Sequence, residues 1–208
     1  MKPAINYSIY LVTDHNCLQG RDFLGCIENA LQGGVTLVQL REKNVDGGIF
    51  LQRAVAVKNL CDKYNVPLLI NDRIDVALAC KAAGVHLGQD DIPPSAARAI
   101  LGPDAIIGVS AHSCEEALAA EKDGADYLGV GAVFPTNSKD DASEVGLNML
   151  KEIRQISKLP IVGIGGINAQ NYTQVRAAGA QGAAIISGIL GVNNIEDEVR
   201  KIKMTISD

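Results

Sequence analysis

Tryptophan is absent from this chain of 208 residues, and all aromatic residues together make up only 4% of it. Basic runs are absent as well, since 19 Lys and Arg against 24 Asp and Glu leave a net charge of −5. Affinity for nucleic acids depends on basic side chains that neutralise phosphates and on aromatic side chains that stack on bases. The composition therefore predicts that nucleic acid is not a partner of this protein.

Paired cysteine motifs are also missing, because the five cysteines are far apart and none forms a CxxC motif. An odd number of dispersed cysteines is typical of reduced thiols in a cytoplasmic protein, and does not favour a disulfide framework or a zinc site. No signal peptide is expected, because Asp14 lies where an apolar segment would be needed. The longest uncharged stretch, Ala177–Ile195, contains four Gly, which indicates a strand, a turn and the start of a helix rather than a membrane span.

What the sequence does contain is a regular alternation of short apolar runs and helical patterns. Strands are expected at Ser8–Thr13, Thr36–Arg41, Leu68–Asn71, Val85–Leu87, Ile106–Ser110, Tyr127–Gly131, Ile161–Gly163 and Ala183–Ser187. Helices are expected at Asp22–Gln32, Gly48–Tyr64, Ile74–Ala82, Ser95–Leu101, Cys114–Lys122, Leu147–Ser157, Ala169–Ala177 and Ile195–Met204. Continuous apolar strands that each lead to a helix are typical of a parallel sheet covered by helices. The pattern predicts one α/β domain over residues 1–208, a closed (β/α)8 TIM barrel, with an open Rossmann-like sheet as the alternative.

Glycine recurs where an expected helix leads into the next strand, at Gly34, Gly84, Gly124 and Gly179. Glycine adopts the positive φ that ends a helix without a clash of a Cβ atom. We therefore expect these four residues to terminate helices.

Polar side chains end several of the expected strands, and in this fold the active site lies at that rim. The second strand ends in Gln39-Leu40-Arg41-Glu42-Lys43. Because side chains alternate along a strand, Gln39, Arg41 and Lys43 would share one face. Burying cations without partners is costly, so an inward orientation predicts an anionic ligand. The alternative is an exposed loop held by salt bridges.

Carboxylates follow the next two strands, in Asn71-Asp72 and in Asp90-Asp91. Carboxylates at adjacent strand ends can converge on one hard cation, and Mg²⁺ often uses one or two of them together with water and phosphate. The spacing predicts a magnesium site. The alternative is that these Asp residues cap the turns or helices that follow.

Groups suited to phosphate are concentrated at the later strand ends. The fifth strand leads to Ser110, and the polar loop after the sixth strand contains Thr136-Asn137-Ser138-Lys139, for which a mobile surface loop is the alternative. The loops after strands seven and eight, Gly163–Ile167 and Ile185–Gly188, can present backbone N–H groups to phosphate. We predict a phosphate site at this end of the barrel.

A protein nucleophile is not expected. Gly108–His112 resembles a nucleophile elbow, but His112 occupies the position that requires Gly. We expect His86 and His112 to be hydrogen-bonded structural residues. Cations for one anionic group, two carboxylates for a metal and a separate phosphate site imply two phosphorylated substrates, or one long substrate, and transfer of a group from a diphosphate.

Taken together, these motifs are similar to those of the thiamine-phosphate synthase family, and the resemblance covers nearly the whole chain. It depends on six segments at consecutive strand ends, Gln39–Lys43, Asn71-Asp72, His86–Asp91, Gly108–His112, Pro135–Lys139 and Gly163–Ile167.

The resemblance implies an enzyme that joins hydroxymethylpyrimidine diphosphate and thiazole phosphate into thiamine phosphate and pyrophosphate, by a dissociative route without a protein nucleophile. The residues implied for the pyrimidine diphosphate are Gln39, Leu40, Arg41, Glu42, Lys43, Asn71, Ser110 and Lys139. Those implied for the thiazole phosphate are Thr136, Asn137, Ser138, Gly166, Ile186 and Ser187, and those implied for Mg²⁺ are Asp72 and Asp91. Ser138 stands where many relatives carry Thr. The resemblance is compatible with a homo-oligomer.

Three other functions remain as alternatives. A thiazole tautomerase-like isomerase, or another phosphate-binding barrel such as an isomerase of tryptophan synthesis, needs no metal pair and no diphosphate site. The combination of Arg41, Lys43, Asp72, Asp91 and Lys139 therefore favours the synthase. A non-catalytic phosphate-binding regulator of the same fold stays open.

Overall fold

The computed structural model describes residues 2, 4–136 and 145–206. In this part of the chain, parallel strands close into a barrel in which each strand pairs with the next and β8 pairs with β1. The strands are β1 (Ile9–Val12), β2 (Leu37–Leu40), β3 (Leu68–Asn71), β4 (Gly84–Leu87), β5 (Ile106–Ala111), β6 (Tyr127–Val130), β7 (Ile161–Ile164) and β8 (Gly182–Ile185). The (β/α)8 barrel is confirmed, and the open sheet is excluded.

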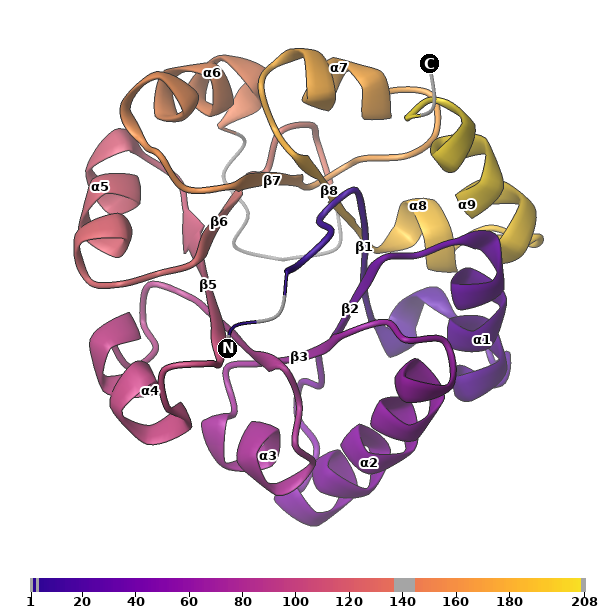
Figure 1. Ribbon diagram of the computed structural model, residues 1–208. Helices are drawn as coiled ribbons and strands as arrows, with labels where there is room; N and C mark the ends of the chain where they lie inside the picture. The colour runs from indigo at the N-terminus through magenta and orange to yellow at the C-terminus, as the bar shows by residue number, and fades with distance from the viewer. Residues whose placement is uncertain (1, 3, 137–144, 207–208) are drawn as a thin grey trace.

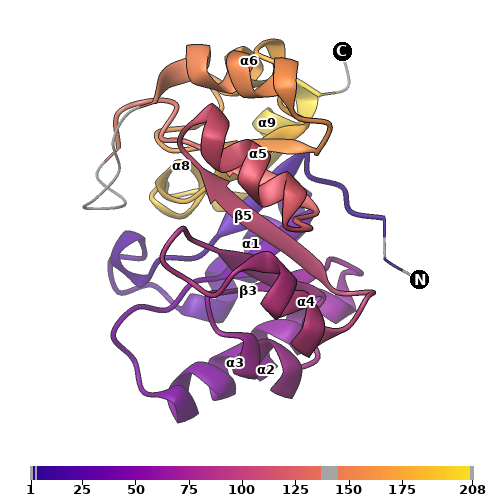
Figure 2. The ribbon, with the colours of Figure 1, turned by 90° about the vertical axis from the view of Figure 1, so that its left-hand side faces the viewer.

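Helices form a ring outside the strands, as the view along the barrel axis shows (Figure 1). They are the 3-10 helix η1 (His15–Cys17), α1 (Phe23–Gly33), α2 (Gly47–Lys63), α3 (Ile74–Ala79), α4 (Pro94–Leu101), α5 (Cys114–Lys122), α6 (Gly146–Ile156), α7 (Tyr172–Ala177), α8 (Ser187–Leu190) and α9 (Ile195–Met204). Figure 2 shows the barrel from the side, with β5 running obliquely past α4 and α5. Among the described residues, no helix has both the length and the apolar character that a membrane crossing requires.

The strand side chains alternate between two apolar layers. Tyr10 and Leu37 belong to the layer inside the barrel, whereas their neighbours Leu11 and Val38 belong to the layer between the strands and the helices. Because successive side chains of a strand point to opposite faces, the position of a residue along its strand decides which layer it joins. This alternation determines which residues at the strand ends can reach a central ligand.

Helix ends follow from local hydrogen bonding. The Asp22 side chain caps α1 by accepting from the Gly25 N–H at 2.6 Å, and Ser113 caps α5 by accepting from the Glu116 N–H at 3.2 Å. Such caps satisfy N–H groups that have no partner within the helix. These residues therefore orient the helices that support the strands.

Three of the four glycines expected to end helices do so, since Gly34, Gly124 and Gly179 have φ of 111°, 90° and 101°. The expectation is wrong for Gly84, which is the first residue of β4. A Cβ atom there would lie 1.8 Å from the carbonyl oxygen of Ile106. A side chain is excluded because β5 passes too close, not because the backbone turns.

The eighth strand was expected to reach Ser187, but it ends at Ile185. Ser187 instead begins α8, a short helix without a separate counterpart among the expected elements. The remaining expected boundaries agree with the structure to within three residues. The sequence therefore predicts correctly which residues lie near the carboxyl end of each strand.

Candidate functional site

Two cavities lie at the carboxyl ends of the strands. The inner cavity has a volume of about 590 Å³ and is lined by side chains from the barrel interior. The outer cavity has a volume of about 1420 Å³ and extends over η1 and the loops after β2 and β7. Both are lined by Arg41, Lys43, Thr136, Gly166, Ile167 and Ser187. Because they share this wall, the two cavities are neighbours at the rim of the barrel.

The segment that ends β2 distributes its side chains as alternation predicts. Gln39, Arg41 and Lys43 line the inner cavity. Glu42 lines the outer cavity, and Leu40 is fully buried in the layer beneath the helices. The structure therefore brings four of these five residues to the cavities, and Leu40 lines neither of them.

Arg41 is held at both its backbone and its side chain. Its N–H donates to Oγ1 of Thr13 at 3.0 Å, and its Nη1 donates to Oδ2 of Asp14 at 3.2 Å. The guanidinium side chain is only 17% exposed. The alternative of an exposed loop is thus wrong for Arg41. Thr13 and Asp14 were missed as supporting residues, because their contact with β2 requires the barrel pairing of β1 with β2.

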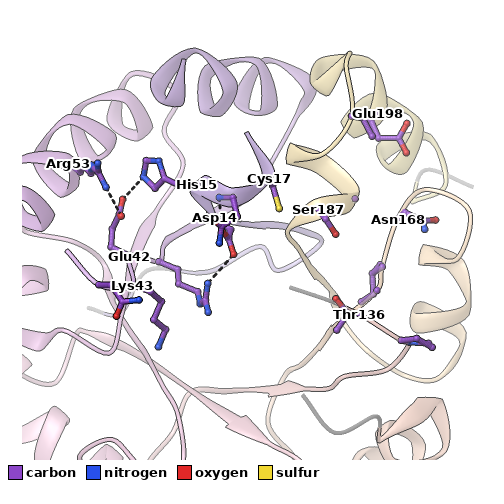
Figure 3. Close-up of a pocket in the computed structure, with 18 of the residues that line it drawn as sticks. Asp14, His15, Cys17, Glu42, Lys43, Arg53, Thr136, Asn168, Ser187 and Glu198 are labelled. Carbon is purple, nitrogen blue, oxygen red and sulfur yellow. Dashed lines mark hydrogen bonds and ion pairs between the residues drawn. The ribbon is translucent and has the colours of Figure 1, made fainter. Parts of the chain in front are cut away.

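Glu42 is a buried carboxylate with two cationic or potentially cationic neighbours. Its side chain is 1% exposed, and its two oxygens accept from His15 Nε2 at 2.8 Å and from Arg53 Nη1 at 2.7 Å. Figure 3 shows both interactions on one side of the outer cavity, with Thr136 and Ser187 on the opposite side. Both carboxylate oxygens are engaged, so Glu42 fixes the backbone between Arg41 and Lys43.

Asp72 and Asp91 converge at the inner cavity. Burial raises the pKa of Asp72, and so do a hydrogen bond and the charge repulsion from the Asp91 carboxyl group beside it. Lys43 Nζ donates to Asp72 Oδ2 at 3.4 Å and opposes this shift. The N–H of Gly88 donates to Asp91 Oδ2 at 2.7 Å and orients that carboxylate. Two acidic groups from different strand ends therefore meet, as their spacing predicted.

Helix capping does not explain these carboxylates. The N-cap residues of the helices that follow are Arg73 for α3 and Pro93 for α4. Asp72 has φ of 61°, in the left-handed region that Asp and Asn tolerate best among residues with side chains. The backbone conformation turns its side chain toward the cavity and the neighbouring Asp91.

The donor set fits a hard divalent cation. In residues 2, 4–136 and 145–206, no group of three or more His, Cys, Asp or Glu forms a cluster that could hold a metal by itself. A cation bound by Asp72 and Asp91 would complete its shell with water and phosphate oxygens, which is the usual arrangement for Mg²⁺. Asn71, 9% exposed, lies beside them in the same cavity.

The expected phosphate end of the barrel is built from glycine backbone and hydroxyl side chains. Thr136, Gly166, Ile186 and Ser187 all line the inner cavity. Gly166 has φ of 63°, and a Cβ atom on it would lie 2.5 Å from the carbonyl oxygen of Pro135. The loop after β7 therefore packs directly against the segment that carries Thr136. Asn137, Ser138 and Lys139 lie outside the described residues.

A chain of hydrogen-bonded polar side chains crosses the barrel interior. Gln39 Nε2 donates to the Tyr10 hydroxyl at 2.5 Å, and that hydroxyl lies 2.9 Å from the Tyr127 hydroxyl. His86 is 2.8 Å from Tyr127 through Nδ1 and 3.0 Å from Ser110 Oγ through Nε2. We call these five residues the interior chain. The tyrosines at these inward positions bring hydroxyl groups that need hydrogen-bond partners, and the other members of the interior chain provide them.

Both histidines singled out in the sequence are hydrogen-bonded to protein groups. His86 belongs to the interior chain, and His112 Nδ1 lies 2.9 Å from Glu116 Oε2. The partner of Ser110 is thus His86 from the neighbouring strand, and not His112 from its own segment. Sequence proximity alone could not reveal this pair, since it depends on the pairing of β4 with β5.

Comparison with known proteins matches the chain to thiamine-phosphate synthases along most of its length. A family model described as thiamine monophosphate synthase matches residues 9–189. The thiamine-phosphate synthase of Clostridium acetobutylicum is 53% identical over 196 residues, which cover 94% of this chain and 93% of that one. The thiamine-phosphate synthase of Desulfitobacterium hafniense is 54% identical over 188 residues, covering 90% and 91%.

A solved structure has the same architecture. Thiamine phosphate pyrophosphorylase from Pyrococcus furiosus superimposes with a TM-score of 0.90 and is 38% identical in sequence. The match covers 97% of this chain and 96% of that one. The two chains therefore share the whole barrel architecture.

Proposed function

This chain belongs to the thiamine monophosphate synthase family, and we propose that it condenses hydroxymethylpyrimidine diphosphate with thiazole phosphate to give thiamine phosphate and pyrophosphate. The observation that carries the proposal is the composition of the inner cavity. There Arg41 and Lys43 lie with the Asp72–Asp91 carboxylate pair. Two cations and a cation-binding acidic pair match the needs of a diphosphate group, which neither isomerisation of a monophosphate nor simple phosphate binding requires.

The proposed reaction exchanges one bond for another. The bond between the pyrimidine methylene carbon and its diphosphate oxygen breaks, and the electron pair leaves with pyrophosphate. The lone pair of the thiazole ring nitrogen then forms a bond to the methylene carbon. No protein nucleophile takes part, so the chain contributes by holding both reactants and stabilising the charge that develops on the leaving group.

Arg41 and Lys43 would bind the diphosphate oxygens. The Thr13 and Asp14 contacts hold Arg41 in place, so its charge is oriented before the substrate arrives. Preorganised cations stabilise the leaving group more effectively than mobile ones, because they need no reorientation during the reaction. Lys139 is proposed as a further cation for this group, and Asn71 and Ser110 as contacts for the pyrimidine diphosphate.

Asp72 and Asp91 would hold Mg²⁺, which supplies charge neutralisation for the diphosphate when it is bound. Gly88 fixes the orientation of Asp91 through its N–H group. Lys43 contacts Asp72 and lines the same cavity, so its ammonium group is available to both the acidic pair and the substrate.

The thiazole phosphate would bind at the other end of the inner cavity. The residues proposed for it are Thr136, Asn137, Ser138, Gly166, Ile186 and Ser187. Because this end and the Arg41–Lys43 end belong to one cavity, both substrates would be bound in the same space.

Incubation of the purified protein with both substrates, each substrate alone, and both without Mg²⁺ tests the proposal. We expect pyrophosphate release and thiamine phosphate only when both substrates and Mg²⁺ are present. Isomerisation of a thiazole phosphate by itself would instead indicate the tautomerase alternative. Binding of phosphate compounds without turnover of any of them would indicate a regulator.

A further inference from the structure

Two short helices, η1 and α8, form part of the wall of the outer cavity. His15 and Cys17 of η1 line the cavity, and so do Ser187 and Gly188 of α8 (Figure 3). Helices of three and four residues are too short to be stable by themselves. Contacts with the rest of the protein therefore hold both helices in place, and these contacts determine the shape of the cavity.

Arg21 joins these two helices with a single guanidinium group. On the η1 side, its Nε donates to the carbonyl oxygen of Leu18 at 2.9 Å, and its Nη2 donates to that of Cys17 at 3.2 Å. On the α8 side, its Nη1 donates to the carbonyl oxygen of Val192 at 2.6 Å, and its Nη2 also donates to that of Leu190. Arg21 therefore connects the loop after the first strand to the helix after the last strand.

The four carbonyl groups that Arg21 contacts lie at or just beyond the carboxyl ends of the two helices. Cys17 is the last residue of η1, and Leu190 is the last residue of α8. Carbonyl groups at these ends have no partner within the helix, and a cation stabilises them. The guanidinium group is planar and carries five N–H donors in a fixed arrangement. Arg21 can therefore satisfy both helix ends and fix the spacing between them.

We propose that Arg21 is a positioning residue for the thiazole phosphate, because it holds α8 against η1 and so fixes Ser187 and Gly188 at the cavity wall. Arg21 lines neither cavity, so it acts through these residues and does not touch the ligand. The diphosphate end does not depend on it in the same way, since Thr13 contacts the Arg41 backbone directly. The identity of the ligand rests on the proposed function, whereas the bridge between the helices does not.

Arg98 forms a comparable bridge at the opposite end of the barrel. It extends from α4 and donates to the carbonyl oxygens of Gly102, Ala105 and Gly124, and to the Asp126 carboxylate at 2.6 Å. These residues precede β5 and β6, so they lie at the amino ends of the strands, whereas both cavities lie at the carboxyl ends. Arg98→Met is therefore the matched control for Arg21→Met.

Steady-state kinetics test the consequence for the substrate. Arg21→Met should raise the KM for the thiazole phosphate about tenfold, the effect of losing one hydrogen bond to a charged group, and leave the KM for the pyrimidine diphosphate unchanged. Arg98→Met should leave both KM values unchanged, although each variant should lower the melting temperature. Equal changes in the two KM values of Arg21→Met, or the same increase in Arg98→Met, would overturn the proposal.

Arg21→Lys separates the geometry of the bridge from its charge, and keeps the proposal testable if Arg21→Met does not fold. Lysine retains the positive charge, but its compact ammonium group replaces the planar arrangement of donors that reaches both helices. The KM for the thiazole phosphate should therefore remain above the wild-type value. A wild-type KM in Arg21→Lys would show that Arg21 acts through its charge, and would overturn the proposed bridge.

Hydrogen exchange of backbone amides tests the bridge without any substrate. The N–H groups of Leu190 and Gly191 close the turn of α8, each with a hydrogen bond of 2.8 Å. Arg21→Met should increase the exchange rate of these two amides, because α8 loses its anchor, and Arg98→Met should not. Unchanged exchange in Arg21→Met would overturn the bridge. Absence of synthase turnover in the wild type would refute the proposed function, and the exchange result would still decide whether Arg21 holds α8.

Discussion

The side chain of Asp72 lies in an environment that disfavours its ionised form. Burial and the neighbouring Asp91 raise its pKa, so the folded protein binds a proton here more tightly than the unfolded chain does. The stabilisation from that proton is present at low pH and is lost as the pH rises through the folded-state pKa. Above that pKa the charge on Asp72 is therefore a cost to the free energy of folding, which a bound divalent cation would offset.

Asp72→Asn should raise the melting temperature of the metal-free protein at pH 7, because it removes the like-charge repulsion while Asn tolerates the left-handed backbone. It should also flatten the decline in stability between acidic and neutral pH. Thermal melts in a chelating buffer at several pH values measure both effects. A lower melting temperature at pH 7 would contradict the unfavourable charge assigned to Asp72.

Asp91→Asn separates the charge of the second carboxylate from its structural role. The amide oxygen of Asn can still accept from the Gly88 N–H, and the repulsion with Asp72 is removed, so we expect a melting temperature at least as high as that of the wild type in the absence of metal. Mg²⁺-dependent turnover should fall by roughly 10²-fold or more if the charge stabilises the leaving group. Asp62→Asn, at an exposed position on α2, serves as the control. Full activity of Asp91→Asn would remove this residue from the metal site.

Glu42→Gln tests how the neighbouring side chains are held. It leaves Arg53 and His15 without their buried carboxylate, and we expect a loss of about 1–2 kcal/mol in the free energy of unfolding. The KM for the diphosphate substrate should rise, because the backbone between Arg41 and Lys43 loses its anchor. Urea unfolding and steady-state kinetics measure the two effects, with Glu28→Gln on α1 as the control. An unchanged KM would show that Glu42 stabilises the fold alone.

Between secondary-structure elements, the loop after β7 depends on its contact with the segment after β6. Gly166→Ala combines a positive φ with a Cβ atom 2.5 Å from the Pro135 carbonyl oxygen, so the segment carrying Thr136 must move. We expect a higher KM for the thiazole phosphate. Gly102→Ala also replaces a glycine with a positive φ, 87°, but its Cβ atom meets nothing within 4 Å. The same KM change in both variants would contradict a local effect on the phosphate site.

A structural feature can be predicted from the sequence when it is determined by residues of the same element. It cannot be predicted when it is determined by contacts with another element. Gln39, Arg41 and Lys43 line one cavity, as alternation predicts, although β2 ends at Leu40 and the Lys43 side chain is 52% exposed. The turn expected at Gly84 was wrong, because the reason for that glycine lies in β5, over twenty residues away. Contacts between strands require the register of the closed barrel, which the apolar pattern does not specify.

For the molecule taken together, the barrel was predictable because eight similar units repeat along the chain. The candidate acidic and basic residues were predictable because they interrupt apolar strands. Their supporting groups were not, since the Asp14–Arg41 and His86–Ser110 pairs join segments that are distant in the sequence. A polar residue next to a strand signals a site, whereas its partner can be identified only from the three-dimensional pairing.

Ligand binding at this site should stabilise the entire fold. Pyrophosphate with Mg²⁺, at about one hundred times its dissociation constant, should add about 2.7 kcal/mol to the free energy of unfolding. For a domain of this size, that corresponds to a rise in melting temperature of roughly 5–10 °C. Differential scanning fluorimetry with pyrophosphate, Mg²⁺ and both together measures it, and Arg41→Gln should reduce the rise. Equal stabilisation by pyrophosphate with and without Mg²⁺ would contradict the shared site.

Gly108 lies against the ring of Tyr127, and this contact limits which amino-acid substitutions the barrel interior can accept. The Tyr127 ring fills the volume that Gly108 leaves empty, so a smaller residue at 127 opens a void and a larger residue at 108 creates a collision. Either substitution made alone is expected to destabilise the fold. The two made together restore the filled volume. Sequence drift inside this barrel is therefore expected to proceed by compensating exchanges across adjacent strands rather than by independent substitutions.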